Sequence, residues 1–202
     1  NRAVSYILPN VKTKFLLEKI SGHIAPASDG IFSVHFSAFG GGDLSGELAL
    51  SGICNRSDGS YDLNVVMKGG AVRSLSFFPI ENLKGTLRIA DNTIHIEDIS
   101  FTIRDIPVRV MGTIQEFEDD PIFNLNFAIE TAHYVAGFTI FGTTDNLKIK
   151  GNSVIADVYH YLYAGDIILS EGGFLLRNLV INDHYTATGD FSFLEGTYTL
   201  IV

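Results

Sequence analysis

The chain has 202 residues and a mass of 22.1 kDa, which is enough to bury a sizeable core in one large domain. Its 14 Lys and Arg against 23 Asp and Glu give a net charge of −9, which argues against nucleic-acid binding because phosphates attract clustered basic residues. The single cysteine excludes an intramolecular disulfide framework, and no apolar run approaches the ~20 residues of a membrane-spanning helix.

The first predicted element runs from Val11 to Ile20 and has two interpretations. A helix would place Val11, Phe15, Leu16 and Ile20 on one face, whereas a strand would place Val11, Thr13, Phe15 and Leu17 on one side. The alternation favours the strand. We therefore expect at most one short helix in the chain.

Apolar and polar residues alternate through four later segments, at residues 61–68, 82–89, 108–115 and 123–130. Successive side chains of a strand point to opposite faces, so each segment has one apolar face and one polar face. One-sided strands of this kind are typical of antiparallel sheets, since parallel sheets are buried on both faces. The pattern predicts an all-β fold.

Turn signals separate these segments, among them Asp58-Gly59, Asp91-Asn92 and Asn182-Asp183. Their spacing of roughly ten to fifteen residues is that of successive hairpins. A unit made of a glycine-led strand, a polar turn and a return strand recurs, beginning at residues 46, 85 and 112. No linker rich in proline, serine or charge interrupts it, so residues 1–202 are interpreted as one continuous domain.

The two ends of the sequence suggest a longer protein. The chain begins at Asn1, and residues 197–202 have the composition of a strand in progress. We expect an excised fragment of a longer chain, with any anchor or signal sequence outside it.

The order of the glycine-led strands resembles the AsmA-like family, including its TamB relatives. The resemblance runs through residues 83–101 and the segment Ile106-Pro107-Val108-Arg109-Val110-Met111-Gly112-Thr113-Ile114, and it continues in residues 165–193. It is clearest from about Gly42 to Phe193.

The resemblance implies an elongated, curled antiparallel sheet of repeated hairpins with an apolar inner groove. It implies a non-enzymatic segment of a cell-envelope protein in lipid transport, membrane homeostasis and outer-membrane biogenesis. The full-length protein would be periplasmic and anchored in the inner membrane by an N-terminal helix that is absent from this sequence. The implied partners are phospholipid or another acyl lipid, neighbouring repeats of the same chain, and a membrane contacted through the missing segments.

A curled sheet would leave its apolar side open as a strip for acyl chains. The residues expected to line this groove are Leu48, Leu50, Leu63, Val65, Leu87, Ile89, Ile94, Ile96, Phe101, Ile103, Val108, Val110, Phe123, Leu125 and Phe127. The same residues could instead form the closed core of a two-sheet sandwich without a ligand.

Other candidate sites are weaker. The six histidines are scattered and lack metal-ligand spacing, and no nucleophile elbow or phosphate-binding loop occurs, so we expect no metal, no cofactor and no enzymatic activity. Tyr159, Tyr161 and Tyr163 share one strand face, as a packing stripe or a platform for sugars. The alternative function is therefore a structural or adhesive β-sandwich domain that binds carbohydrate. Cys54 is interpreted as a small half-buried hydrophobic residue.

Overall fold

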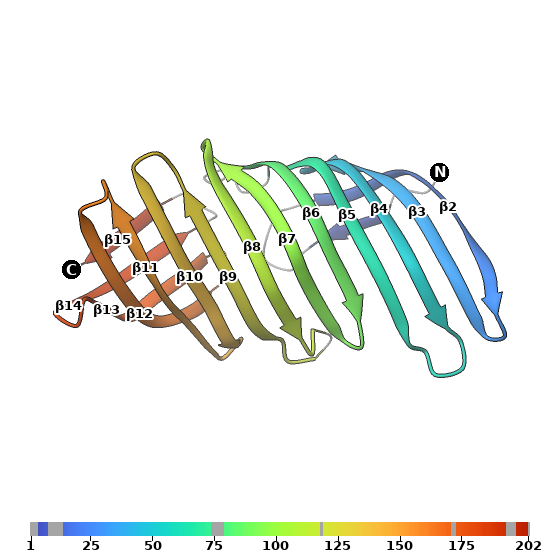
Figure 1. Ribbon diagram of the computed structural model, residues 1–202. Coiled ribbons are helices and arrows are strands. Elements are labelled where there is room, and N and C mark those ends of the chain that lie inside the picture. Colours follow the sequence, from blue (N-terminus) through green and yellow to red (C-terminus); the bar gives the residue numbers. More distant parts are fainter. Residues whose placement is uncertain are drawn as a thin grey trace.

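In the computed structural model, the chain forms a single antiparallel sheet in which each strand pairs with its neighbours in sequence (Figure 1). The structure describes residues 4–7, 14–73, 79–117, 119–170, 173–192 and 197–201, and no helix occurs in these ranges. The strands are β1 (Val4–Ile7), β2 (Lys14–Ser28), β3 (Ile31–Gly42), β4 (Leu44–Asn55), β5 (Tyr61–Val72), β6 (Ile80–Ala90), β7 (Thr93–Ile103), β8 (Ile106–Gln115), β9 (Ile122–Glu130), β10 (Tyr134–Thr143), β11 (Asn146–Ile155), β12 (Tyr159–Ser170), β13 (Gly173–Ile181), β14 (Tyr185–Ser192) and β15 (Thr197–Ile201). The predicted all-β fold of repeated hairpins is confirmed.

The segment with two interpretations is a strand where the structure describes it. β2 begins at Lys14 and continues to Ser28, so Lys14–Ile20 are extended. Residues 11–13 lie outside the described part. The strand interpretation favoured by the sequence is therefore confirmed for residues 14–20.

The predicted turns close tight hairpins. Asp91 and Asn92 have φ angles of 48° and 54°, and Asn182 and Asp183 have φ angles of 51° and 57°. Two consecutive left-handed residues are characteristic of a type I′ turn, whose twist matches that of the flanking strands. Asn and Asp tolerate this conformation better than other non-glycine residues, which explains their place in these turns.

The sheet curls along its length, so that β1 lies behind the middle strands and β13–β15 lie behind β9–β11 (Figure 1). β-Bulges contribute to this curvature because an extra residue on one strand bends it and increases its twist. Pairing shifts between Ile96 and Ile99 in β7 and between Leu176 and Leu179 in β13. At the second of these, Asn178 takes a φ of 51°.

The described strands form a single layer. The solvent-accessible area is 12610 Å², whereas a compact monomer of this mass exposes about 9,300 Å². The described strands form one sheet, so the two-sheet sandwich considered as an alternative is wrong. The open curled sheet that the resemblance implied is the observed architecture.

Burial is concentrated on one face of the sheet. The buried apolar residues on that face are Val34, Ala38, Val108, Val110, Ala136, Leu147, Ile167, Leu179 and Ala187. Ala90, on the other face, is also buried. Among the described residues no large side chain is less than 2 % exposed, so this core is thin.

Candidate functional site: the apolar concave face

Cross-strand pairing connects the apolar residues of successive strands into continuous rows. Leu63 of β5 pairs with Ile89 of β6, which pairs with Ile94 of β7. Ile94 pairs with Ile114 of β8, which in turn pairs with Phe123 of β9. Because directly paired residues project from the same side of a sheet, these five side chains lie on one face. We call this face, on the inside of the curl, the concave face.

A second row runs parallel to the first. Val65 pairs with Leu87, Leu87 with Ile96, and Gly112 of β8 pairs with both Ile96 and Leu125. The small Gly112 lies in this row between two larger apolar residues. The rows together give the concave face an uninterrupted apolar surface from β5 to β9.

The register brings all fifteen residues predicted to line a groove onto this one face. They are Leu48, Leu50, Leu63, Val65, Leu87, Ile89, Ile94, Ile96, Phe101, Ile103, Val108, Val110, Phe123, Leu125 and Phe127. Val108 and Val110 are buried, and the others are partly exposed. Their contact with a lipid stays a prediction.

The opposite, convex face is mainly polar, although it also exposes apolar residues such as Ile53, Leu162 and Val180, and it carries ion pairs between strands. The Arg88 guanidinium donates two hydrogen bonds to Asp62, with distances of 2.6 Å and 2.7 Å, and Arg109 pairs with Asp98 in the same way at 2.7 Å and 2.8 Å. These hydrogen bonds hold the pKa of both carboxyl groups below the ordinary value of 3.8. The convex face is thus suited to water, in contrast to the concave one.

Two open hollows lie on the convex face and were not predicted from the sequence. One, of about 640 Å³, lies beside Gly137 and Ala164, and the other, of about 810 Å³, lies beside Ala128 and Arg109. Each forms where small residues stand among longer polar neighbours. Both are open depressions of the polar surface and do not connect the apolar rows of the concave face.

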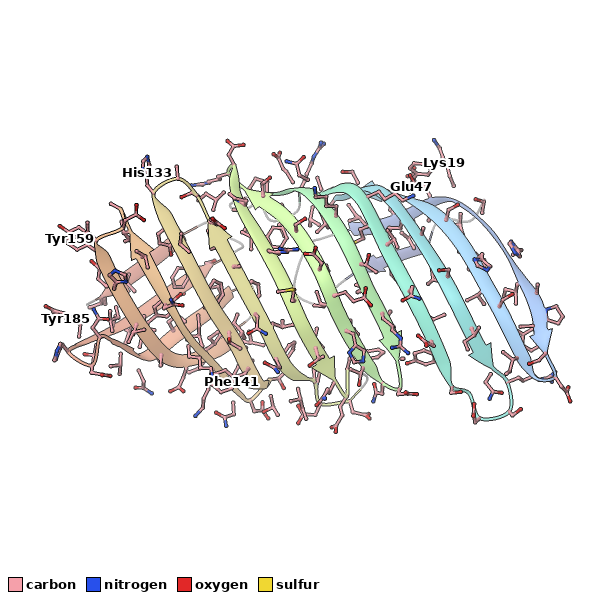
Figure 2. The ribbon with its side chains drawn as sticks, viewed as in Figure 1. Lys19, Glu47, His133, Phe141, Tyr159 and Tyr185 are labelled. Atoms are coloured by element: carbon pink, nitrogen blue, oxygen red, sulfur yellow. The ribbon has the colours of Figure 1, made fainter. Side chains whose placement is uncertain are left out.

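The tyrosine row belongs to the concave face. Tyr161 pairs with Ser153 and Tyr163 pairs with Gly151 of β11, both of which lie on that face. Tyr159 is 60 % exposed at the rim, and Figure 2 places Tyr159 and Tyr185 at the C-terminal end of the sheet, far from Lys19 and Glu47. The row therefore extends the concave face with amphipathic side chains.

Sequence reasoning missed two polar residues beside this row. Tyr134 is the first residue of β10 and lies on the same face as Ala136 and Phe138. The period-two pattern of apolar residues could have placed it there from the sequence alone. Ser153 is only 7 % exposed, and a lone serine in the alternation gave no signal of its own. Burial raises the pKa of Tyr163 to about 12, and electrostatic interaction with Tyr134 adds to this effect.

Aromatic stacking organises the neighbouring apolar surface. The Phe127 and Phe138 rings stack with their centroids 4.7 Å apart and an interplanar angle of 6°. Phe174 and Phe191 stack in the same way, also at 4.7 Å. Both pairs join cross-strand partners, so they reinforce the curl where one strand follows the next.

The described residues contain no group of three or more His, Cys, Asp or Glu arranged to hold a metal ion. In the same part of the chain, no helix has the length and apolar character needed to cross a membrane. Cys54 is a free, partly exposed thiol that pairs with Tyr61 across β4 and β5. Comparison of the chain with protein-family models, curated proteins and solved structures finds no match.

Proposed function

We propose that this chain is a segment of an AsmA-like envelope protein and that its concave face carries acyl chains without catalysing a reaction. In this proposal the full-length protein is periplasmic and anchored in the inner membrane. The observation that supports it best is a continuous apolar face on a single sheet, which no second layer of the described strands covers. A folded domain rarely leaves such a surface without a partner.

The chemistry of the face fits a hydrocarbon chain. Its residues from β5 to β9 offer methyl and methylene groups and aromatic rings, for example Val65, Leu87 and Leu125. Each methylene that leaves water contributes ~0.8 kcal/mol, so ten buried methylenes give roughly 8 kcal/mol before the cost of association. Burial of one acyl chain is therefore enough for useful affinity.

The same chemistry permits movement along the sheet. Apolar contacts are non-directional, so an acyl chain can shift from one strand to the next while it exchanges similar contacts. The rows cross the sheet from strand to strand, in the direction in which hairpins are added. A polar headgroup can stay in water at the open side while the chain slides.

The carbohydrate-binding alternative receives less support. Its sandwich architecture is wrong, and Tyr161 and Tyr163 are partly buried on the apolar face. A sugar platform needs aromatic faces that are open to solvent, and of the three tyrosines in the row only Tyr159 is strongly exposed.

The proposal predicts that a charge on the concave face prevents lipid uptake. Leu125 lies between Gly112 and Ile140 on that face, so Leu125→Asp places a carboxylate in the path of the acyl chain. The preceding residue, Asn124, is exposed on the convex face, and Asn124→Asp is the matched control. Purified proteins would be incubated with phospholipid vesicles and their bound lipid counted by native mass spectrometry.

We expect the unaltered protein and Asn124→Asp to take up acyl lipid, and Leu125→Asp to lose at least 90 % of that uptake (about 1.4 kcal/mol). Circular dichroism would establish that Leu125→Asp keeps its strand content. Uptake by a folded Leu125→Asp equal to that of the control would contradict the proposed path. Absence of lipid from the unaltered protein would contradict the proposed function itself.

A further inference from the structure

The concave face is not uniform along the sheet. From β6 to β9, its described positions carry only glycine and apolar side chains, represented by Ile96, Val110 and Leu125. From β10 to β12 the same face carries five hydroxyl groups, of which that of Tyr159 lies exposed at the rim and the other four lie close together. These four belong to Tyr134, Ser153, Tyr161 and Tyr163, which we call the hydroxyl cluster.

Pairing and electrostatics show that the cluster is compact. Ser153 pairs with Ala136 on one side and with Tyr161 on the other, so its hydroxyl lies between β10 and β12. Tyr163 is two residues beyond Tyr161 and thus on the same face. The influence of Tyr134 on the pKa of Tyr163 brings the fourth member within electrostatic reach.

The Ser153 hydroxyl has no hydrogen bond to any residue that the structure describes, although the residue is only 7 % exposed. Buried polar groups are nearly always hydrogen-bonded, because an unpaired one loses its interaction with water without replacement. The Ser153 hydroxyl therefore calls for a hydrogen-bond partner that the described residues do not supply.

The cluster offers hydrogen-bond donors to a partner. A tyrosine with a pKa of about 12 stays protonated at neutral pH, so Tyr163 presents an O–H donor. The described concave positions of β10–β14 carry no Lys or Arg, and Asp157 and Asp183 stand in the exposed turns at the adjoining rim. A phosphate would find no positive charge here and would be repelled by the nearby carboxylates. The site therefore favours an uncharged hydrogen-bond acceptor.

We propose that the hydroxyl cluster binds the ester carbonyl oxygens of a diacyl lipid and thereby fixes the polar end of the lipid at β10–β12. This inference rests on the proposed function, since it assigns a position to a lipid on the concave face. The acyl chains then extend over the aliphatic rows toward β9 and β6. The headgroup projects past the rim that carries Tyr159, which Figure 2 shows at the outer end of the sheet.

The test compares two lipids that differ only at the carbonyl oxygens. Short-chain diester phosphatidylcholine and its diether analogue would each displace a pyrene-labelled alkane from the protein, with fluorescence as the readout. The altered protein carries Ser153→Ala, Tyr161→Phe and Tyr163→Phe, which remove three hydroxyl groups and keep the apolar bulk. Thr186→Val removes a hydroxyl from the exposed convex face of β14 and is the control.

The unaltered protein and Thr186→Val should bind the diester at least about tenfold more tightly than the diether, as expected for one or two lost hydrogen bonds. The triple variant should bind both lipids with the diether affinity, and its unchanged affinity for the alkane would establish that the groove is intact.

Equal affinity of the unaltered protein for diester and diether, with the alkane bound, would overturn this inference and leave the proposed function standing. A diester preference that survives in the triple variant would also overturn it. Failure of the unaltered protein to bind either the lipids or the alkane would contradict both proposals.

Discussion

Glycines on the concave face determine how closely neighbouring strands approach one another. Gly85 and Gly112 have φ angles of 146° and 140°, in a region that side chains with a Cβ atom rarely adopt. A Cβ at Gly112 would collide with the backbone carbonyl oxygen of Asn124, and a Cβ at Gly85 would collide with that of Asp98. Glycine is therefore required at the start of these repeat units because the backbones of neighbouring strands come into close contact there.

Gly112→Ala should destabilise the protein by about 1–3 kcal/mol, because it combines an unfavourable φ with a backbone collision. Gly137→Ala is the matched control, since a Cβ there has Asn152 Oδ1 as its nearest neighbour at 3.5 Å, an ordinary contact. Urea denaturation would measure both. A Gly112→Ala protein as stable as Gly137→Ala would show that the sheet tolerates a side chain at this bend.

The ion pairs of the convex face give the folded state a defined acid sensitivity. Hydrogen bonds from Arg109 lower the pKa of Asp98 below 3.8 in the folded protein. The contribution of this carboxylate to stability is thus present above the unfolded-state value near 3.8 and is lost as the pH falls through the folded-state pKa. The effect is small because both side chains are exposed.

We expect the unaltered protein to be more stable than Asp98→Asn at pH 6, and the difference between them to shrink as the pH falls from 4 to 2. Urea midpoints measured across this range would check it. The other carboxyl groups are the same in both proteins. A stability difference between them that stays constant from pH 4 to pH 2 would therefore mean that Asp98 does not contribute in this way.

At the scale of the strands, period-two alternation was the most informative part of the sequence. It predicted the strands and placed Leu63, Ile94 and Leu125 on a common face, because the side chains of a strand alternate strictly. The bulge at Asn178 and the pairing shift after Ile96 could not be predicted, since both depend on how two strands meet. The open sheet came from a resemblance, and alternation alone left a sandwich equally possible.

The turn between β13 and β14 is hydrogen-bonded to β12, a strand that the turn does not connect. Asn182, between β13 and β14, accepts a hydrogen bond from the Leu162 amide through Oδ1 at 2.7 Å and donates one to the His160 carbonyl oxygen at 3.1 Å. Its side chain therefore fixes the start of β12 to the turn that follows β13. This contact strengthens the sheet close to the hydroxyl cluster.

Asn182→Gly keeps a residue suited to the left-handed conformation and removes both hydrogen bonds, at a cost of about 1–2 kcal/mol. Hydrogen–deuterium exchange at the Leu162 amide should be faster in this variant, because the amide loses its hydrogen-bond acceptor, Asn182 Oδ1. Asp183→Gly makes the same change at the adjacent left-handed residue and should leave this amide protected. Equal exchange in the two variants would rule out this role for Asn182.

At the scale of the whole molecule, the fold has an amphipathic surface of unusual extent. One curled layer separates a mainly polar convex face with cross-strand ion pairs from a concave face that is mainly apolar. The accessible area of 12610 Å², against about 9,300 Å² for a compact chain, is the consequence of leaving that layer uncovered. The functional proposals depend on this asymmetry between the two faces.

The most direct measurement is photo-crosslinking from defined positions on the two faces. The photoreactive amino acid p-benzoylphenylalanine would replace Val65 on the concave face or, separately, Met111, which is 43 % exposed on the convex face. After incubation with phospholipid vesicles and irradiation, mass spectrometry would identify lipid adducts. We predict acyl adducts from position 65 and almost none from position 111. Equal labelling from both positions, or labelling from 111 alone, would contradict the assignment of acyl chains to the concave face.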